Sequence, residues 1–201
     1  EGGVRREKGI SFGEALRIEG VVVYALALGA LGFVDYGMLF WLPRFMESNY
    51  GVSQSLTNNL ASMFDVGQIV GGILAGWFSD RLGKRSPIIV LMLIIAQLLT
   101  LTLFLDMTHF GILYFAIPVL GMSIGGPYNI MCAAISSDLL KSSRIRGNTA
   151  ALSIITGIIA ATGGMGAALG QTLIGYIQQF GWRYLFLAFL IVLSLCELAL
   201  A

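Results

Sequence analysis

Six stretches of the chain carry almost no charged side chains. The central parts of four contain no Asp, Glu, Lys or Arg, and each of the other two is interrupted by a single acid, Asp35 or Asp65. A bilayer core about 30 Å thick is crossed by about 20 apolar residues in a helix. The predicted membrane spans are residues 21–42, 60–79, 88–105, 110–136, 149–177 and 182–200.

These spans predict helices rather than strands. Backbone amides in hydrocarbon must be hydrogen-bonded within their own segment, and the stretches lack the regular ten-residue alternation of a barrel. Hydrophobic residues make up 57% of the chain and charged residues 11%, against about 25% charged in a soluble domain. We therefore expect an all-α membrane protein with six transmembrane helices.

The chain divides into residues 1–20 and the six-helix bundle of residues 21–201. Within the first region, Ile10 to Glu19 mixes apolar and charged residues, as in a short helix on the membrane surface or a plain linker. Because the chain begins with Glu1 and this region lacks the apolar core of a signal peptide, we expect a fragment of a longer protein.

The basic residues alternate between the connections of the predicted helices. Ten of the twelve Lys and Arg lie before the first span, in the second connection or in the fourth. Short cytoplasmic loops accumulate Lys and Arg, so both ends of the chain are expected in the cytoplasm. Arg44 and Arg183 lie at the opposite edge, where they are expected to anchor helix ends by snorkelling.

The composition excludes several classes of function. A net charge of +1 argues against a nucleic-acid partner. Cys132 and Cys196 fall within spans and fit packing, and the single histidine, His109, has no companions for a metal site or a nucleophile–base pair. We expect no enzyme, no cofactor and no metal.

Glycine and proline mark packing and bending. The pairs around Gly67–Gly76 and Gly163–Gly170 are typical of close helix packing, with hinges or cavity walls as the alternative. Pro43 is expected to end the first span after Trp41 and Leu42. The Gly125-Gly126-Pro127 run predicts either a static kink or a break in the fourth span where a transport site could lie.

The second connection carries the most informative pattern. It has the form G-x-x-x-D-R-x-G-K-R, in which a glycine permits the turn and one acid stands beside three cations. Such charges can pair in one conformation and separate in another. The residues of this predicted conformational-switch loop are Gly76, Asp80, Arg81, Gly83, Lys84 and Arg85.

This loop resembles the signature of the major facilitator superfamily, between the second and third helices of each six-helix half. An ordered set of further segments resembles the C-terminal half of sugar-phosphate exchangers among the organophosphate:phosphate antiporters, from about Ile10 onward. It comprises Trp41-Leu42-Pro43, Asp65-Val66-Gly67, Gly71-Gly72, Ser79-Asp80, Lys84-Arg85-Ser86-Pro87, Gly125-Gly126-Pro127, Ser137-Asp138-Leu139, Gly166-Ala167-Ala168-Leu169-Gly170 and Gly181-Trp182.

The resemblance implies one half of a facilitator fold that exchanges a sugar phosphate or glycerol phosphate for inorganic phosphate by alternating access. The implied partners are a phosphorylated small molecule, the lipid bilayer and a missing N-terminal six-helix half. The implied location is the endoplasmic reticulum or another membrane. Bacterial glycerol-phosphate relatives carry an arginine in the first helix of this half, where this sequence has Asp35.

Polar side chains within the spans are the candidates for a substrate cavity, because they must find partners or face water. Asp65, an intramembrane acid beside the glycine run, is favoured as a structural group. For Asp35, a structural hydrogen bond or ion pair and a direct role in transport are both open. The cavity candidates are Tyr24, Asp35, Tyr36, Gln68, Tyr128 and Asn129.

Two alternatives to phosphate exchange follow from the same residues. Since no span contains a basic residue in its middle, Asp35 also fits a proton- or cation-coupled carrier of a non-phosphorylated solute. A six-helix chain alone cannot form both walls of a rocking carrier, so a non-transporting membrane subunit is the other alternative.

Overall fold

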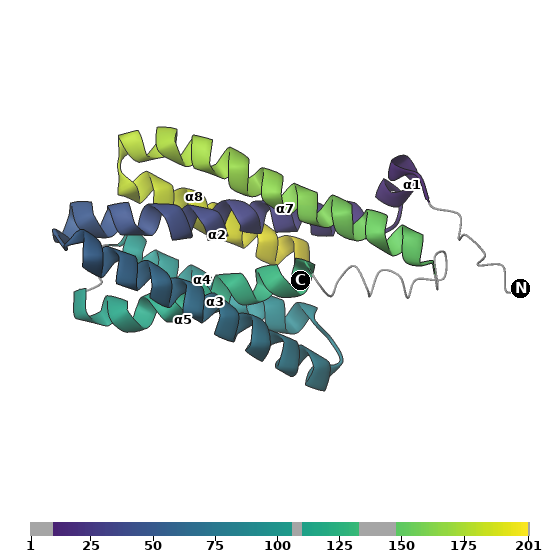
Figure 1. The fold of residues 1–201 in the computed structure, drawn as a ribbon, viewed down its shortest axis with the longest axis horizontal. Coiled ribbons are helices and arrows are strands. Elements are labelled where there is room, and N and C mark those ends of the chain that lie inside the picture. Colours follow the sequence, from purple (N-terminus) through teal and green to yellow (C-terminus); the bar gives the residue numbers. More distant parts are fainter. Residues whose placement is uncertain (1–9, 106–109, 133–147, 201) are drawn as a thin grey trace, which may run out of the picture.

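The fold consists of long helices that run side by side (Figure 1). The computed structural model describes residues 10–105, 110–132 and 148–200. Six of its helices are long and apolar enough to cross a membrane, which confirms the predicted all-α fold. They are α2 (Val21–Tyr50), α3 (Gln54–Leu82), α4 (Ser86–Phe104), α5 (Phe110–Ile130), α7 (Thr149–Ile177) and α8 (Trp182–Leu200).

Two shorter helices complete the described elements. Helix α1 (Phe12–Leu16) is closed by a capping box in which Ser11 and Glu14 each accept a hydrogen bond from the other's backbone N–H. It packs against α7 and α2, so the prefix forms a helix rather than a plain linker. A 3₁₀ turn, η2 (Gln178–Phe180), leads from α7 into α8.

Helix α2 lies in the centre of the bundle. It packs mainly against α7 and also contacts α3, α5 and α8, while α3 packs mainly against α5 (Figure 1). The remaining helix, α4, packs against both α5 and α8. Helix α2 therefore contacts both α7 and the α3–α5 pair.

Glycines set the closeness of the two main helix pairs. A Cβ on Gly67 or Gly71 of α3 would collide with the backbone carbonyl of Pro118 or Met122 of α5. In the other pair, a Cβ on Gly166 would collide with the carbonyl of Gly29. These contacts confirm the packing interpretation at those positions, because small residues let helix backbones approach in the membrane. Gly76 and Gly164 have open space instead.

The expected end of the first span at Pro43 is wrong. Helix α2 continues through this proline to Tyr50 and ends where Gly51 adopts the left-handed conformation, with φ of 61°. Pro43 removes one backbone hydrogen bond, yet the next turn buries Phe45 and Met46, and this packing keeps the helix continuous. The connection between α2 and α3 is therefore confined to residues 51–53.

Helix α5 is also continuous. The sequence had predicted either a static kink or a break at Gly125-Gly126-Pro127, and the helix is not broken there. It runs through Pro118 and Pro127 to Ile130 and is followed by π-helical residues 131 and 132. The expected end of this span at residue 136, and the basic residues of the fourth connection, lie outside the described residues.

Candidate functional site

Asp35 and Gln68 form the centre of a polar cluster in the middle of the bundle. Asp35 lies on α2 with only 4% of its surface exposed, and its Oδ1 accepts a hydrogen bond from Gln68 Nε2 of α3 at 2.8 Å. The two residues are 33 positions apart in the sequence. The bond crosses between two helices, so it fixes the direction of the Asp35 carboxyl group.

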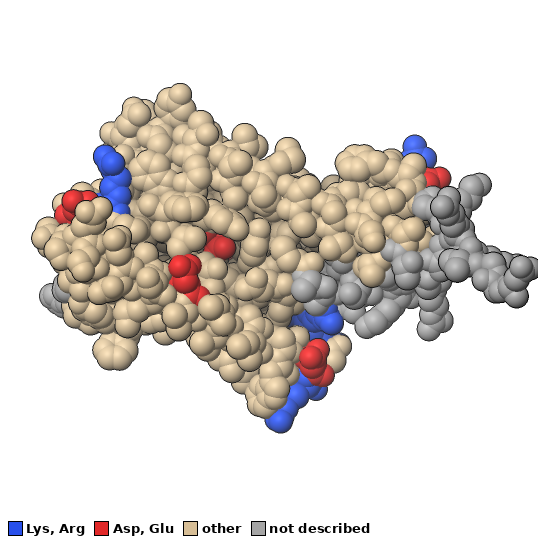
Figure 2. All heavy atoms as spheres, in the orientation of Figure 1, with Lys and Arg blue, Asp and Glu red and all other residues tan. Residues whose placement is uncertain are grey.

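Asp65 lies near Asp35, on α3, but it is exposed rather than buried. Its side chain is exposed, and its carboxyl group is close enough to Asp35 to interact with it electrostatically. No described residue forms a hydrogen bond or ion pair with Asp65. On the face in Figure 2, acidic atoms show in the middle of a surface that carries basic atoms only toward its ends.

Two tyrosines extend this cluster toward α5 and α7. The rings of Tyr36 and Tyr128 meet edge to face, with their centroids 6.2 Å apart. The Tyr128 hydroxyl lies over Gly163 of α7, where an added Cβ would be 3.0 Å away. The structure thus brings together four of the predicted cavity residues, namely Asp35, Tyr36, Gln68 and Tyr128, from three helices.

The other two predicted cavity residues lie elsewhere. Tyr24 is half-buried on α2 and precedes Asp35 by 11 positions, about 16 Å along a helix. Asn129 is exposed and packs its side chain on Gly72. It lines a groove of about 450 Å³ together with Asp80 and Arg85, so it belongs with the end of α3 rather than with Asp35.

Three of the six residues of the predicted switch loop lie within helix α3. Asp80 and Arg81 occupy the last turn of α3, and only residues 83–85 form the connection to α4. Gly83 ends the helix in the left-handed conformation with φ of 66°, which glycine adopts without steric cost. The Arg81 guanidinium stacks on the Trp77 ring at 3.9 Å from its centroid.

Comparison with known proteins identifies this arrangement. A sequence profile of the Major Facilitator Superfamily matches residues 12–201, nearly the whole chain and all six long helices. The chain belongs to the major facilitator superfamily. The fold resemblance drawn from the second connection is therefore confirmed.

Within this superfamily, the chain is similar to sugar phosphate and glucose-6-phosphate exchangers. Sugar phosphate exchanger 3 of Mus musculus is 38% identical over 93% of this chain. Glucose-6-phosphate exchanger SLC37A2 of Xenopus tropicalis is 39% identical over 88%, and glucose-6-phosphate exchanger SLC37A1 of Mus musculus is 42% identical over 88%. The matched regions are 38%, 36% and 34% of those relatives, so the chain spans little more than a third of their length.

Sequence reasoning missed two polar contacts of this facilitator segment. Trp41 Nε1 donates to Gln171 Oε1 at 2.9 Å and joins α2 to α7. Gln97 of α4, with its amide oriented to suit both partners, donates to Glu197 at 2.9 Å and accepts from Ser194 at 2.6 Å. The amides of Gln97 and Gln171 could have predicted these contacts, because a polar group within an apolar span needs a hydrogen-bond partner.

The facilitator segment offers no metal centre among the described residues. In that part of the chain, no group of three or more His, Cys, Asp or Glu side chains could hold a metal ion. The chemistry that the central cluster can supply is hydrogen bonding by Gln68 and the tyrosine hydroxyls, and negative charge from Asp35 and Asp65. It can orient a polar solute or pair with a cation.

Proposed function

We propose that the complete protein exchanges an organic phosphate, a sugar phosphate or glycerol phosphate, for inorganic phosphate by alternating access. The observation that carries this proposal is the similarity to sugar phosphate and glucose-6-phosphate exchangers along nearly the whole chain. The fold agrees with it, because the chain has the six spans of one facilitator half.

The central cluster supports a shared substrate cavity. Asp35, Tyr36, Gln68 and Tyr128 lie together in the middle of the bundle. A phosphate dianion in a membrane needs cationic partners, and Arg44, Arg81 and Arg183 all lie near helix ends. The proposal therefore assigns the phosphate-binding cation to a preceding six-helix half, where it would also face Asp35.

Reconstituted transport tests the proposal. The full-length protein in proteoliposomes loaded with unlabelled phosphate is expected to take up labelled phosphate and labelled glucose 6-phosphate or glycerol phosphate. External organic phosphate should compete with labelled phosphate uptake. Absence of exchange with phosphate and with both organic phosphates, in protein that is folded by size-exclusion chromatography, would rule the proposal out.

A second candidate function is proton- or cation-coupled transport of a non-phosphorylated solute. The hydrogen-bonded carboxyl of Asp35 favours it, since an intramembrane acid is a common element of proton relays. Asp35→Asn keeps an oxygen for Gln68 but removes the charge. A coupled carrier should lose its dependence on an imposed pH gradient in this variant, whereas a phosphate exchanger should show no such dependence before or after the change.

We also propose that both ends of the chain face the cytoplasm, in the endoplasmic reticulum membrane. Asp80, Arg81, Lys84 and Arg85 would then form a cytoplasmic switch at the end of α3. Single cysteines introduced at Lys84 and at Gly51 test the orientation. A membrane-impermeant thiol reagent applied from the cytoplasmic side should label the first and spare the second, and the reverse pattern would invert the topology.

A further inference from the structure

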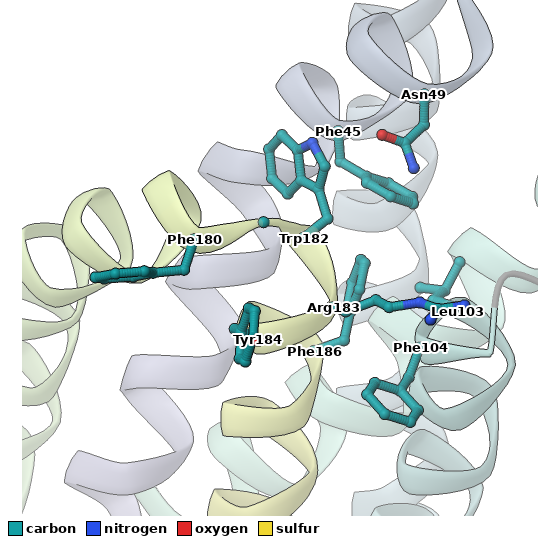
Figure 3. A pocket seen from close by; sticks show the side chains of 10 residues that line it. Phe45, Asn49, Leu103, Phe104, Phe180, Trp182, Arg183, Tyr184 and Phe186 are labelled. Atoms are coloured by element: carbon teal, nitrogen blue, oxygen red, sulfur yellow. The ribbon is translucent and has the colours of Figure 1, made fainter.

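A pocket at the end of the bundle opposite Asp80 and Arg81 is separate from the central cluster. It has a volume of about 290 Å³ and lies between the end of α2, the end of α4 and the beginning of α8 (Figure 3). None of the central cluster residues lines it. Its chemistry therefore calls for a separate explanation.

The polar groups of this pocket are hydrogen-bond donors. The amide nitrogen of Asn49 is a donor, and Figure 3 shows it directed into the pocket. Among the described residues, none forms an ion pair with Arg183, and none accepts a hydrogen bond from the Trp182 indole. Among the residues that the structure describes, no acid lines the pocket. This set suits an oxyanion.

The rest of the wall is aromatic and preformed. Phe45 packs edge to face against Trp182 at 5.3 Å and against Phe186 at 4.9 Å between ring centroids. Phe104 of α4 adds a further ring, and Figure 3 shows the Arg183 side chain extended toward this apolar side. A soluble anion would leave these rings in contact with water, whereas an acyl chain would cover them.

The position matches the edge of the membrane. The pocket is formed by helix ends and carries Trp182, Arg183 and Tyr184, the residue types that gather at membrane–water interfaces. We propose that it holds an anionic phospholipid from the leaflet on that side. The Arg183 guanidinium binds the phosphate group, and the first part of an acyl chain lies against Phe104 and Phe186.

Native mass spectrometry of the full-length protein in detergent tests this proposal with phosphatidylglycerol as the probe. The unmodified protein is expected to retain phosphatidylglycerol in preference to phosphatidylcholine, whose choline cation finds no acid among the described lining residues. Arg183→Gln should weaken retention of one phosphatidylglycerol about tenfold, and Arg183→Lys should restore most of it, because a charge-assisted hydrogen bond is lost and then regained.

Arg44→Gln is the matched control. Arg44 lies on the end of α2 that contributes Phe45 and Asn49 to the pocket, but it does not line the pocket itself. It should leave retention unchanged. Equal losses in the two variants would show interfacial anchoring only and overturn the proposal, as would unchanged retention in Arg183→Gln. Displacement of phosphatidylglycerol by millimolar glycerol phosphate or inorganic phosphate would overturn it too, because the site would then belong to a soluble anion.

Discussion

The middle of the bundle and the end of α3 both carry acids, but only the end carries its own cations. Asp80 stands beside Arg81 and is followed within five residues by Lys84 and Arg85. Asp35 and Asp65 lie more than a helical turn from any Lys or Arg in their own helices and near one another. An acid at the membrane edge can be neutralised locally or by water, whereas an acid at mid-membrane needs a partner from another segment.

Glycines of α3 in the two regions differ in how closely another helix approaches them. A Cβ on Gly71, near the middle of α3, would meet the backbone of α5, while a Cβ on Gly76, closer to the end of the helix, would have nothing within 4 Å. A rigid middle suits a site that must keep its geometry.

The largest expected effect tests this difference in packing. Gly71→Val would push α3 away from the Met122 carbonyl, and overpacking of this kind costs about 1–3 kcal/mol. We expect little folded full-length protein by fluorescence size-exclusion chromatography. Gly76→Val is the control and should give near-normal yield. Equal yields for the two variants would contradict the packing difference.

The second prediction concerns the charge at mid-membrane. Asp35→Ala removes both the acceptor of Gln68 and a buried acid, and an unpaired buried polar group costs about 1–3 kcal/mol. We expect the exchange rate of the full-length protein in proteoliposomes to fall at least tenfold.

Asp65→Ala is the comparison, because this exposed side chain has no hydrogen bond to a described residue. We expect its effect to stay within about threefold. If Asp65→Ala reduced the rate more than Asp35→Ala, the hydrogen-bonded pair would not be the centre of the site.

Much of the fold was accessible from the sequence because the membrane imposes a simple rule on charge. Helices α7 and α8 begin and end at the same residues as two predicted spans, 149–177 and 182–200, whose placement in a membrane stays a prediction. The course of α2 beyond Pro43 was not accessible, because burial of Phe45 and Met46 by other helices decides it. The Asp35–Gln68 bond was likewise hidden, since the sequence does not show which faces of α2 and α3 meet.

The third prediction addresses the switch at the end of α3. Asp80→Asn changes a charge that lies far along the helix from Asp65, about 22 Å away at 1.5 Å per residue. It should therefore alter the rate of exchange severalfold while KM for the organic phosphate stays within about twofold. Initial rates over a range of substrate concentrations separate the two parameters. A changed KM with an unchanged maximal rate would place Asp80 in substrate binding instead.

The smallest expected effect concerns the contact between Trp77 and Arg81. The guanidinium lies 3.9 Å from the ring centroid, and an exposed cation–π contact contributes about 0.5–1 kcal/mol. Trp77→Leu should lower the melting temperature of the full-length protein by no more than a few degrees, with folded yield preserved. Phe78→Leu keeps the stacked pair and serves as the control. If both variants lowered the melting temperature equally, loss of aromatic surface rather than of the cation–π contact would explain the effect, and the end of α3 would be held mainly by apolar packing.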